Sequence, residues 1–127
     1  MIDHMSVGVA DVDSAKDFYT KTLGELGFGL LAEMPGLLAY GENSIQFLAM
    51  RPFDGEAASA GNGMHVAFKA TSQEQVDAFH STAMANGATC EGAPGTRAYP
   101  HAEVYAAYIR DPFGHKLEVL TNGFAPK

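Results

Sequence analysis

The chain repeats one order of predicted elements, and this internal duplication limits the folds that it can adopt. Apolar periodicity in the first half predicts a strand over 2–10, a helix from Asp11 to about Leu26, and strands at about 28–34, 37–41 and 44–50. The second half predicts a strand over 64–70, a helix from about Thr71 to Asn86-Gly87, and strands at about 89–98, 104–110 and 115–121. Residues 51–63, rich in Gly and Ala, predict a loop. Each half is therefore expected to form one βαβββ module.

The two halves can be aligned on a pair of histidines. With His4 set against His65, the apolar positions of the first strands and helices coincide, and Gln46 falls against Glu118 near the end of each half. One βαβββ module leaves a face of its sheet unburied, so two modules are expected to pack together. The prediction is an α+β fold. It is a single domain over 1–127, with modules of about 1–52 and 63–123 whose curved mixed sheet surrounds a cleft.

Composition excludes several classes of partner. Hydrophobic residues form 46% of the chain and charged residues 18%, which is typical of a globular protein. The net charge of −7 argues against nucleic-acid binding, and no apolar run is long enough to cross a membrane. The N-terminal residues show no secretory signal, and Cys90 is the only cysteine. We therefore expect a cytoplasmic location, with Cys90 as a small buried hydrophobe.

The paired positions predict a metal site in the cleft. His4 and His65 open the first strand of each module, while Gln46 and Glu118 lie on the last, so their side chains are expected to converge. Two His plus one carboxylate can hold a divalent first-row metal and leave positions open for substrate. The alternative is structural, because a strand His is usually hydrogen-bonded and a buried carboxylate usually has a cationic partner. A metal explains the acid inside the apolar strand Leu-Glu-Val-Leu, whereas His115 in the preceding turn is expected to face solvent.

Polar and aromatic residues concentrate in the stretch GTRAYPHAEVYAAY, residues 95–108. Four of them would share one side of a straight strand and could bind an acidic or carbonyl substrate: Arg97, Tyr99, His101 and Tyr105. Pro100 predicts a break in that strand, and tyrosines beside a proline also commonly cover a sheet edge. The sequence leaves both interpretations open.

Three segments resemble a known family. DHMSVGVADVDSAKDFY, GMHVAFKATS and IRDPFGHKLEVL are similar to the vicinal oxygen chelate superfamily, which includes glyoxalases, bleomycin-resistance and fosfomycin-resistance proteins and extradiol dioxygenases. The resemblance covers nearly the whole chain, is weakest at 51–63, and is most specific in the closing D-P-x-G-x-x-x-E. It implies paired βαβββ modules, a homodimer, and one divalent metal ion (Ni, Zn, Mn or Fe) that activates a substrate with two neighbouring oxygens.

The resemblance also implies roles for individual residues. His4, His65 and Glu118 match metal ligands of the family, and Gln46 matches the position of a fourth ligand, Glu or Gln, in glyoxalases. Bacterial glyoxalases with a His-Glu-His-Glu set have an acid at that position. With the neutral Gln46, compensation of the metal charge would depend on Glu118 alone. Bleomycin-binding relatives lack these ligands, which argues against that function here.

The expected function is that of a glyoxalase-like metalloenzyme. It would be a lyase or isomerase of the hemithioacetal type, with Glu118 as the base that moves a proton. One alternative is a thiol transferase or dioxygenase of the same superfamily, although Arg97 and Lys116 are the only cations where phosphonate-binding groups are needed. A second alternative is a metal-free protein that binds a small molecule. The expected partners are a small-molecule substrate, a thiol co-substrate as one option, and a second copy of the chain.

Overall fold

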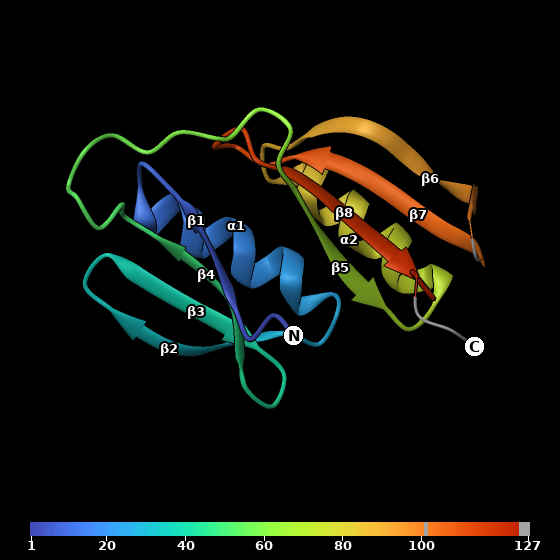
Figure 1. Ribbon diagram of the computed structural model, residues 1–127, viewed down its shortest axis with the longest axis horizontal. Coiled ribbons are helices and arrows are strands. Elements are labelled where there is room, and N and C mark those ends of the chain that lie inside the picture. Colours follow the sequence, from blue (N-terminus) through green and yellow to red (C-terminus); the bar gives the residue numbers. More distant parts are fainter. Residues whose placement is uncertain (101, 125–127) are drawn as a thin grey trace.

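The computed structural model describes residues 1–100 and 102–124 and contains two βαβββ modules side by side (Figure 1). The first module contains β1 (Met5–Gly8), α1 (Val12–Gly24), β2 (Gly29–Met34), β3 (Leu37–Gly41) and β4 (Ile45–Met50). The second contains β5 (His65–Ala70), α2 (Gln73–Ala85), β6 (Thr89–Tyr99), β7 (Ala102–Arg110) and β8 (Lys116–Thr121). The predicted α+β fold of duplicated βαβββ modules is confirmed.

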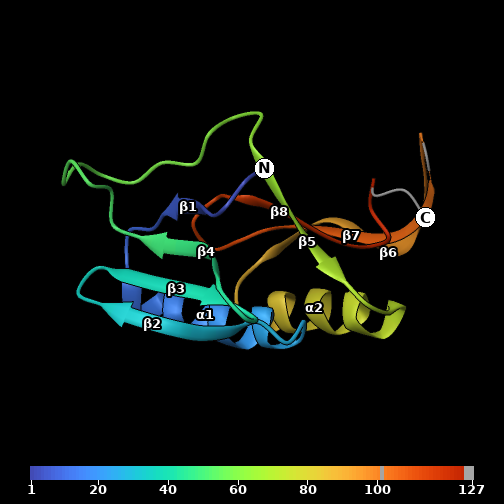
Figure 2. The same cartoon turned by 60° about the horizontal axis from the view of Figure 1, so that its bottom comes forward.

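Each module has its own mixed four-stranded sheet. The strand orders are β1-β4-β3-β2 and β5-β8-β7-β6, with the first and last strands of each module parallel and the other neighbours antiparallel. Both helices lie on the same side of the sheets (Figure 2) and contact each other. In the part of the chain that the structure describes, neither helix is long and apolar enough to span a membrane.

Side chains of the sequence define both helices locally. The Asp11 carboxylate accepts a hydrogen bond from the backbone N–H of Asp13, and the Ser72 hydroxyl accepts one from Gln75, so each helix has an N-cap. The chain leaves α2 through Gly87, whose φ of +100° lies in the region that favours glycine.

Both modules contribute to one hydrophobic core. Its buried residues come from α1 and α2 and from the sheet faces that the helices cover. Across the junction, the rings of Phe47 on β4 and Phe68 on β5 are in edge contact, with centroids 5.1 Å apart. Such a pair adds to the stabilisation that burial of the rings already provides. The two modules therefore share apolar surface as well as a covalent connection.

A buried carboxylate joins the turn between β7 and β8 to the first module. Asp111 is 4% exposed, and its Oδ1 accepts hydrogen bonds from the backbone N–H groups of Phe113, at 2.9 Å, and His115, at 2.8 Å. Its Oδ2 accepts a hydrogen bond from the hydroxyl of Tyr19 on α1. Burial and the neighbouring Asp111 carboxylate raise the pKa of Tyr19 well above its usual value, so this phenol stays a donor at neutral pH. Gly114 completes the turn with a φ of +93°.

His115 makes a second link across the junction. Its Nε2 donates a hydrogen bond to the carbonyl oxygen of Gly8 on β1, over 2.7 Å, and the residue is partly buried. The expectation that His115 faces solvent is therefore wrong. Asp111 holds the turn against the first module, and this brings the imidazole of His115 to Gly8 at the end of β1.

Replacement of Tyr19 by Phe tests the Asp111 link. The variant leaves Oδ2 of a buried carboxylate without its donor, so the free energy of unfolding should fall by about 1–3 kcal/mol. Tyr40→Phe is the matched control, because the only hydrogen-bond partner of the Tyr40 hydroxyl among the described residues is the hydroxyl of the exposed Thr20. Urea unfolding of both variants measures the difference, and equal small losses would contradict the role given to Asp111.

Candidate functional site

His65 and Glu118 meet on the second sheet. The imidazole Nε2 of His65 lies 3.3 Å from Oε1 of Glu118, with the His side chain 49% exposed and the Glu side chain 5% exposed. In the β5–β8 register Glu118 lies opposite Ala67, two residues beyond His65, so the contact runs diagonally between neighbouring parallel strands. The carboxylate that interrupts an apolar strand therefore has an imidazole as its neighbour.

The alternation of β8 directs Glu118 away from the helices. Leu117 and Val119 belong to the core that α1 and α2 cover, whereas Leu120 packs with Val104 and Ala106 on the opposite face. Successive strand residues point to opposite faces, so Glu118 shares the face of Leu120. A carboxylate can occupy this face because polar side chains stand around it.

Two tyrosines provide that polar surrounding. Tyr108 on β7 lies directly opposite Glu118 in the β7–β8 register, and Tyr99 at the end of β6 donates a hydrogen bond to Glu118 Oε2 over 2.6 Å. The hydroxyls of Tyr99 and Tyr108 are also hydrogen-bonded to each other. Burial, followed by the hydrogen bond to Glu118, raises the pKa of Tyr99, so its phenol is protonated at neutral pH.

Two cations stand at the edge of this cluster. The guanidinium carbon of Arg97 is 5.9 Å from the centroid of the Tyr108 ring, and Nζ of Lys116 is 5.5 Å from it. Both distances suit cation–π attraction. Arg97 also donates to the backbone carbonyl oxygens of Ala93 and Gly95, at 2.8 and 2.7 Å, which fixes its guanidinium. The surroundings of Glu118 thus include positive charge that forms no ion pair with it.

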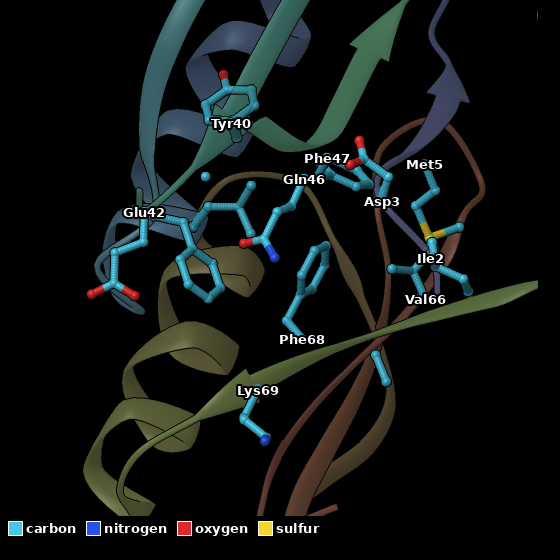
Figure 3. A pocket seen from close by; sticks show the side chains of 14 residues that line it. Ile2, Asp3, Met5, Tyr40, Glu42, Gln46, Phe47, Val66, Phe68 and Lys69 are labelled. Carbon is cyan, nitrogen blue, oxygen red and sulfur yellow. The ribbon is translucent and has the colours of Figure 1, made fainter. Parts of the chain in front are cut away.

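His4 and Gln46 lie apart from this cluster. His4 is exposed and its Nδ1 is 2.7 Å from a carboxylate oxygen of Asp3. Gln46 lines a cavity of about 410 Å³ at the junction of the modules, and Phe68 of the second module lines the same cavity (Figure 3). In residues 1–100 and 102–124, no three His, Cys, Asp or Glu side chains are grouped closely enough to hold a metal ion. One copy of the chain therefore joins His65 to Glu118 but does not bring His4 to them.

The two modules also differ in register. Met5 lies opposite Phe47, so His4 and Gln46 directly precede paired residues, whereas Glu118 is displaced by two positions from the partner of His65. The equivalence of the two pairs is thus approximate. A displacement of two residues does not change the face of a strand. Gln46 therefore still shares a sheet face with His4, and Glu118 shares one with His65.

Other predicted residues lie elsewhere. Tyr105 packs on the helix side of β7 and donates to the Asp77 carboxylate on α2 over 2.7 Å, so it is not brought together with Tyr99. His101 lies outside the described residues. Cys90, expected to be buried, is exposed, because β6 is an edge strand with a bulge between Cys90 and Gly92, and its Sγ is 3.3 Å from Nε2 of His80.

Tyr108 lies beside Glu118 but is not among the site residues predicted from the sequence. A signal for it exists, since Asp111-Pro112-Phe113-Gly114 predicts a tight turn between two strands. Counting outward from that turn pairs Arg110 with Lys116 and Tyr108 with Glu118, as the structure has them. The alternation of β7 then separates Tyr108 from Tyr105.

The donors present are suited to a divalent metal. His65 offers a neutral imidazole nitrogen and Glu118 a carboxylate oxygen, the donor types that first-row metals bind in proteins. Among the described residues, His65 is the only salt-bridge partner of the buried Glu118 carboxylate. A charged group this deeply buried is costly without a cation, so a metal ion next to Oε1 would compensate it. The site fits a metal but provides only part of a ligand set.

Comparisons with known proteins identify relatives of this fold. The chain is 29% identical over 126 residues to the metallothiol transferase FosB of Shouchella clausii (strain KSM-K16), covering 99% of this chain and 83% of the relative. A glyoxalase/bleomycin resistance protein from Albidiferax ferrireducens T118 superposes with a TM-score of 0.89 at 40% identity, covering 94% and 98% of the two chains. A lactoylglutathione lyase from Agrobacterium tumefaciens shares the fold, with a TM-score of 0.67 at 24% identity, covering 98% and 97%.

A family model matches residues 1–119, nearly the whole chain, and its family is the one that the three sequence segments resemble. The chain belongs to the Glyoxalase/Bleomycin resistance protein/Dioxygenase superfamily.

Proposed function

We propose that this protein is a glyoxalase-like metalloenzyme that acts on a small substrate with two neighbouring oxygens, as a lyase or isomerase of the hemithioacetal type. The observation that carries the proposal is the buried Glu118 carboxylate, which contacts His65 and has no Lys or Arg ion-pair partner among the described residues. The family relationship supports metal dependence in general terms. A cytoplasmic location is part of the same proposal, because the single cysteine requires no oxidising compartment.

A second copy of the chain would complete the site. Within one copy only His65 and Glu118 are in contact, whereas His4 and Gln46 are exposed on the other module. In a twofold symmetric dimer, the same two surfaces meet twice. His4 and Gln46 of one copy could then join His65 and Glu118 of the other, which gives two equivalent sites. The full ligand set of two imidazoles, a carboxylate and an amide suits Ni, Zn, Mn or Fe.

The residues of the site would have separate roles in catalysis. A bound divalent ion would supply Lewis-acid stabilisation of the negative charge that develops on the paired substrate oxygens. Glu118 would accept a proton from substrate, and the contact of one of its oxygens with the half-exposed His65 supports this role. Arg97 and Lys116 would attract an anionic group on the substrate to the same face.

These two cations favour a second candidate, a metal-dependent thiol transferase. They stand next to Tyr108, whose ring lies opposite Glu118, and the relative named a metallothiol transferase matches 99% of this chain. A substrate with a phosphonate or carboxylate group would use the same metal ligands together with these cations. The co-substrate would then be a thiol.

Metal content tests the main proposal. Protein purified without chelator and without a metal-affinity tag should contain about one divalent ion per chain. His65→Ala or Glu118→Gln should lose this ion, because removal of one ligand weakens metal binding. His80→Ala is the matched control, because His80 contacts Cys90 away from the site. Elemental analysis provides the measurement. Absence of metal, with no thermal stabilisation by added Ni, Zn, Mn or Fe, would favour the metal-free binding protein instead.

Co-expression of two variants tests whether two copies share the site. His4→Ala and His65→Ala should each lose metal when expressed alone. Mixed dimers of the two retain one intact site out of two, so random pairing should restore about a quarter of the wild-type metal content. Mixed dimers isolated through two different tags should contain about half of the wild-type metal content. Mixed pairs without metal would show that the ligands belong to one copy.

Lys116→Met tests the second candidate. It removes the charge but keeps an unbranched apolar chain, so KM for a phosphonate substrate in a thiol-transfer assay should rise about ten- to a hundredfold. Lys21→Met, on α1 at the helix side of the sheets, should leave KM unchanged. If no phosphonate promotes thiol consumption, the hemithioacetal type is retained.

A further inference from the structure

We propose that Tyr99 is a positioning residue that fixes the orientation of the Glu118 carboxylate, so that one oxygen binds Tyr99 and the other faces His65. The proposal assigns Tyr99 a task different from substrate binding. It rests on the proposed function only insofar as the positioned oxygen is to bind a metal, because the hydrogen-bond geometry itself does not depend on a metal.

The two oxygens of Glu118 have separate partners. Oε2 accepts the hydroxyl proton of Tyr99 over 2.6 Å, while Oε1 is 3.3 Å from Nε2 of His65. A short hydrogen bond to a charged acceptor is stronger than one between neutral groups. Turning the plane of the carboxylate would break this bond and leave an oxygen of the buried Glu118 side chain without its donor. One oxygen is thus held by the phenol, and the other is left for the open face.

The Tyr99 hydroxyl has no proton left for a substrate. A phenol has one O–H donor, and Tyr99 gives it to Glu118. The hydrogen bond between the two phenols must therefore run from Tyr108 to Tyr99. The chain of donors from Tyr108 through Tyr99 to Glu118 polarises each member in the same direction, which strengthens the final bond.

Tyr99 is itself held in place from two sides. Its ring stacks on that of Phe124, with centroids 5.2 Å apart and planes at 19°, and its hydroxyl meets Tyr108. Tyr108 in turn is within cation–π distance of Arg97 and Lys116 and lies directly opposite Glu118. Partners that orient a metal-ligating side chain commonly affect metal affinity almost as much as the ligands themselves. Tyr99 has the contacts expected of such a partner.

The first test uses the metal-free protein. Crystal structures of the wild type and Tyr99→Phe, both grown with chelator, compare the position of Glu118. We expect its carboxylate in the variant to rotate out of contact with His65, because Oε2 has lost its donor. Tyr108→Phe, which keeps the Tyr99 hydroxyl, should retain the contact. An unchanged Glu118 in Tyr99→Phe would overturn the proposal, whether or not the protein binds metal.

The second test measures metal affinity by competition with a coloured chelator, using Zn²⁺ as the probe. Tyr99→Phe should weaken Zn²⁺ binding by about ten- to a hundredfold, and Tyr108→Phe should weaken it less. Tyr105→Phe is the control for loss of a tyrosine hydroxyl, since Tyr105 bonds Asp77 on the opposite face of the same sheet. Wild-type affinity in Tyr99→Phe would contradict the positioning role. Absence of Zn²⁺ binding by the wild type would instead contradict the proposed function, and the crystal structures would still decide the role of Tyr99.

Discussion

The Asp111 carboxylate is the constraint on which the arrangement of the second sheet depends. Removing a carboxylate from water is costly, and here two backbone N–H groups and the Tyr19 hydroxyl take the place of its hydration. These bonds define the turn between β7 and β8 and attach it to α1. Because the register of a hairpin follows from its turn, the same contacts determine that Tyr108 faces Glu118. A site residue is thus positioned by a buried acid seven residues away.

Two buried carboxylates therefore do different work within one hairpin. Both carboxylate oxygens of Asp111 accept hydrogen bonds from the protein, and these bonds join the two modules. Glu118 receives one phenol donor and an imidazole, and it borders an open face. The hydrogen bonds of Asp111 stabilise the fold, whereas Glu118, with a phenol and an imidazole as partners, is the carboxylate that we propose as a metal ligand.

Periodicity in the sequence predicted most of the architecture. Apolar residues recur every second position in the strands and every three to four positions in the helices, because one side of each element is buried. This pattern predicted the ends of the elements to within a few residues. The pairing of His65 with Glu118 followed from the duplication of the module. The environment of single residues was harder to predict. Cys90 is exposed because β6 is a bulged edge strand, and His115 is partly buried because a remote turn holds it against Gly8. Both depend on contacts between elements that periodicity does not report.

The two-residue displacement between the modules has a stereochemical consequence. Glu118 stands diagonally to His65, whereas Gln46 follows the register of His4 directly. If two copies combine these pairs, the four donors would stand at unequal heights around a centre formed by a symmetric assembly. Every site built from L-residues is chiral and presents different surroundings to the two faces of a flat carbonyl compound. The displacement of Glu118 along β8 would then help to decide which of these two faces is turned toward its carboxylate.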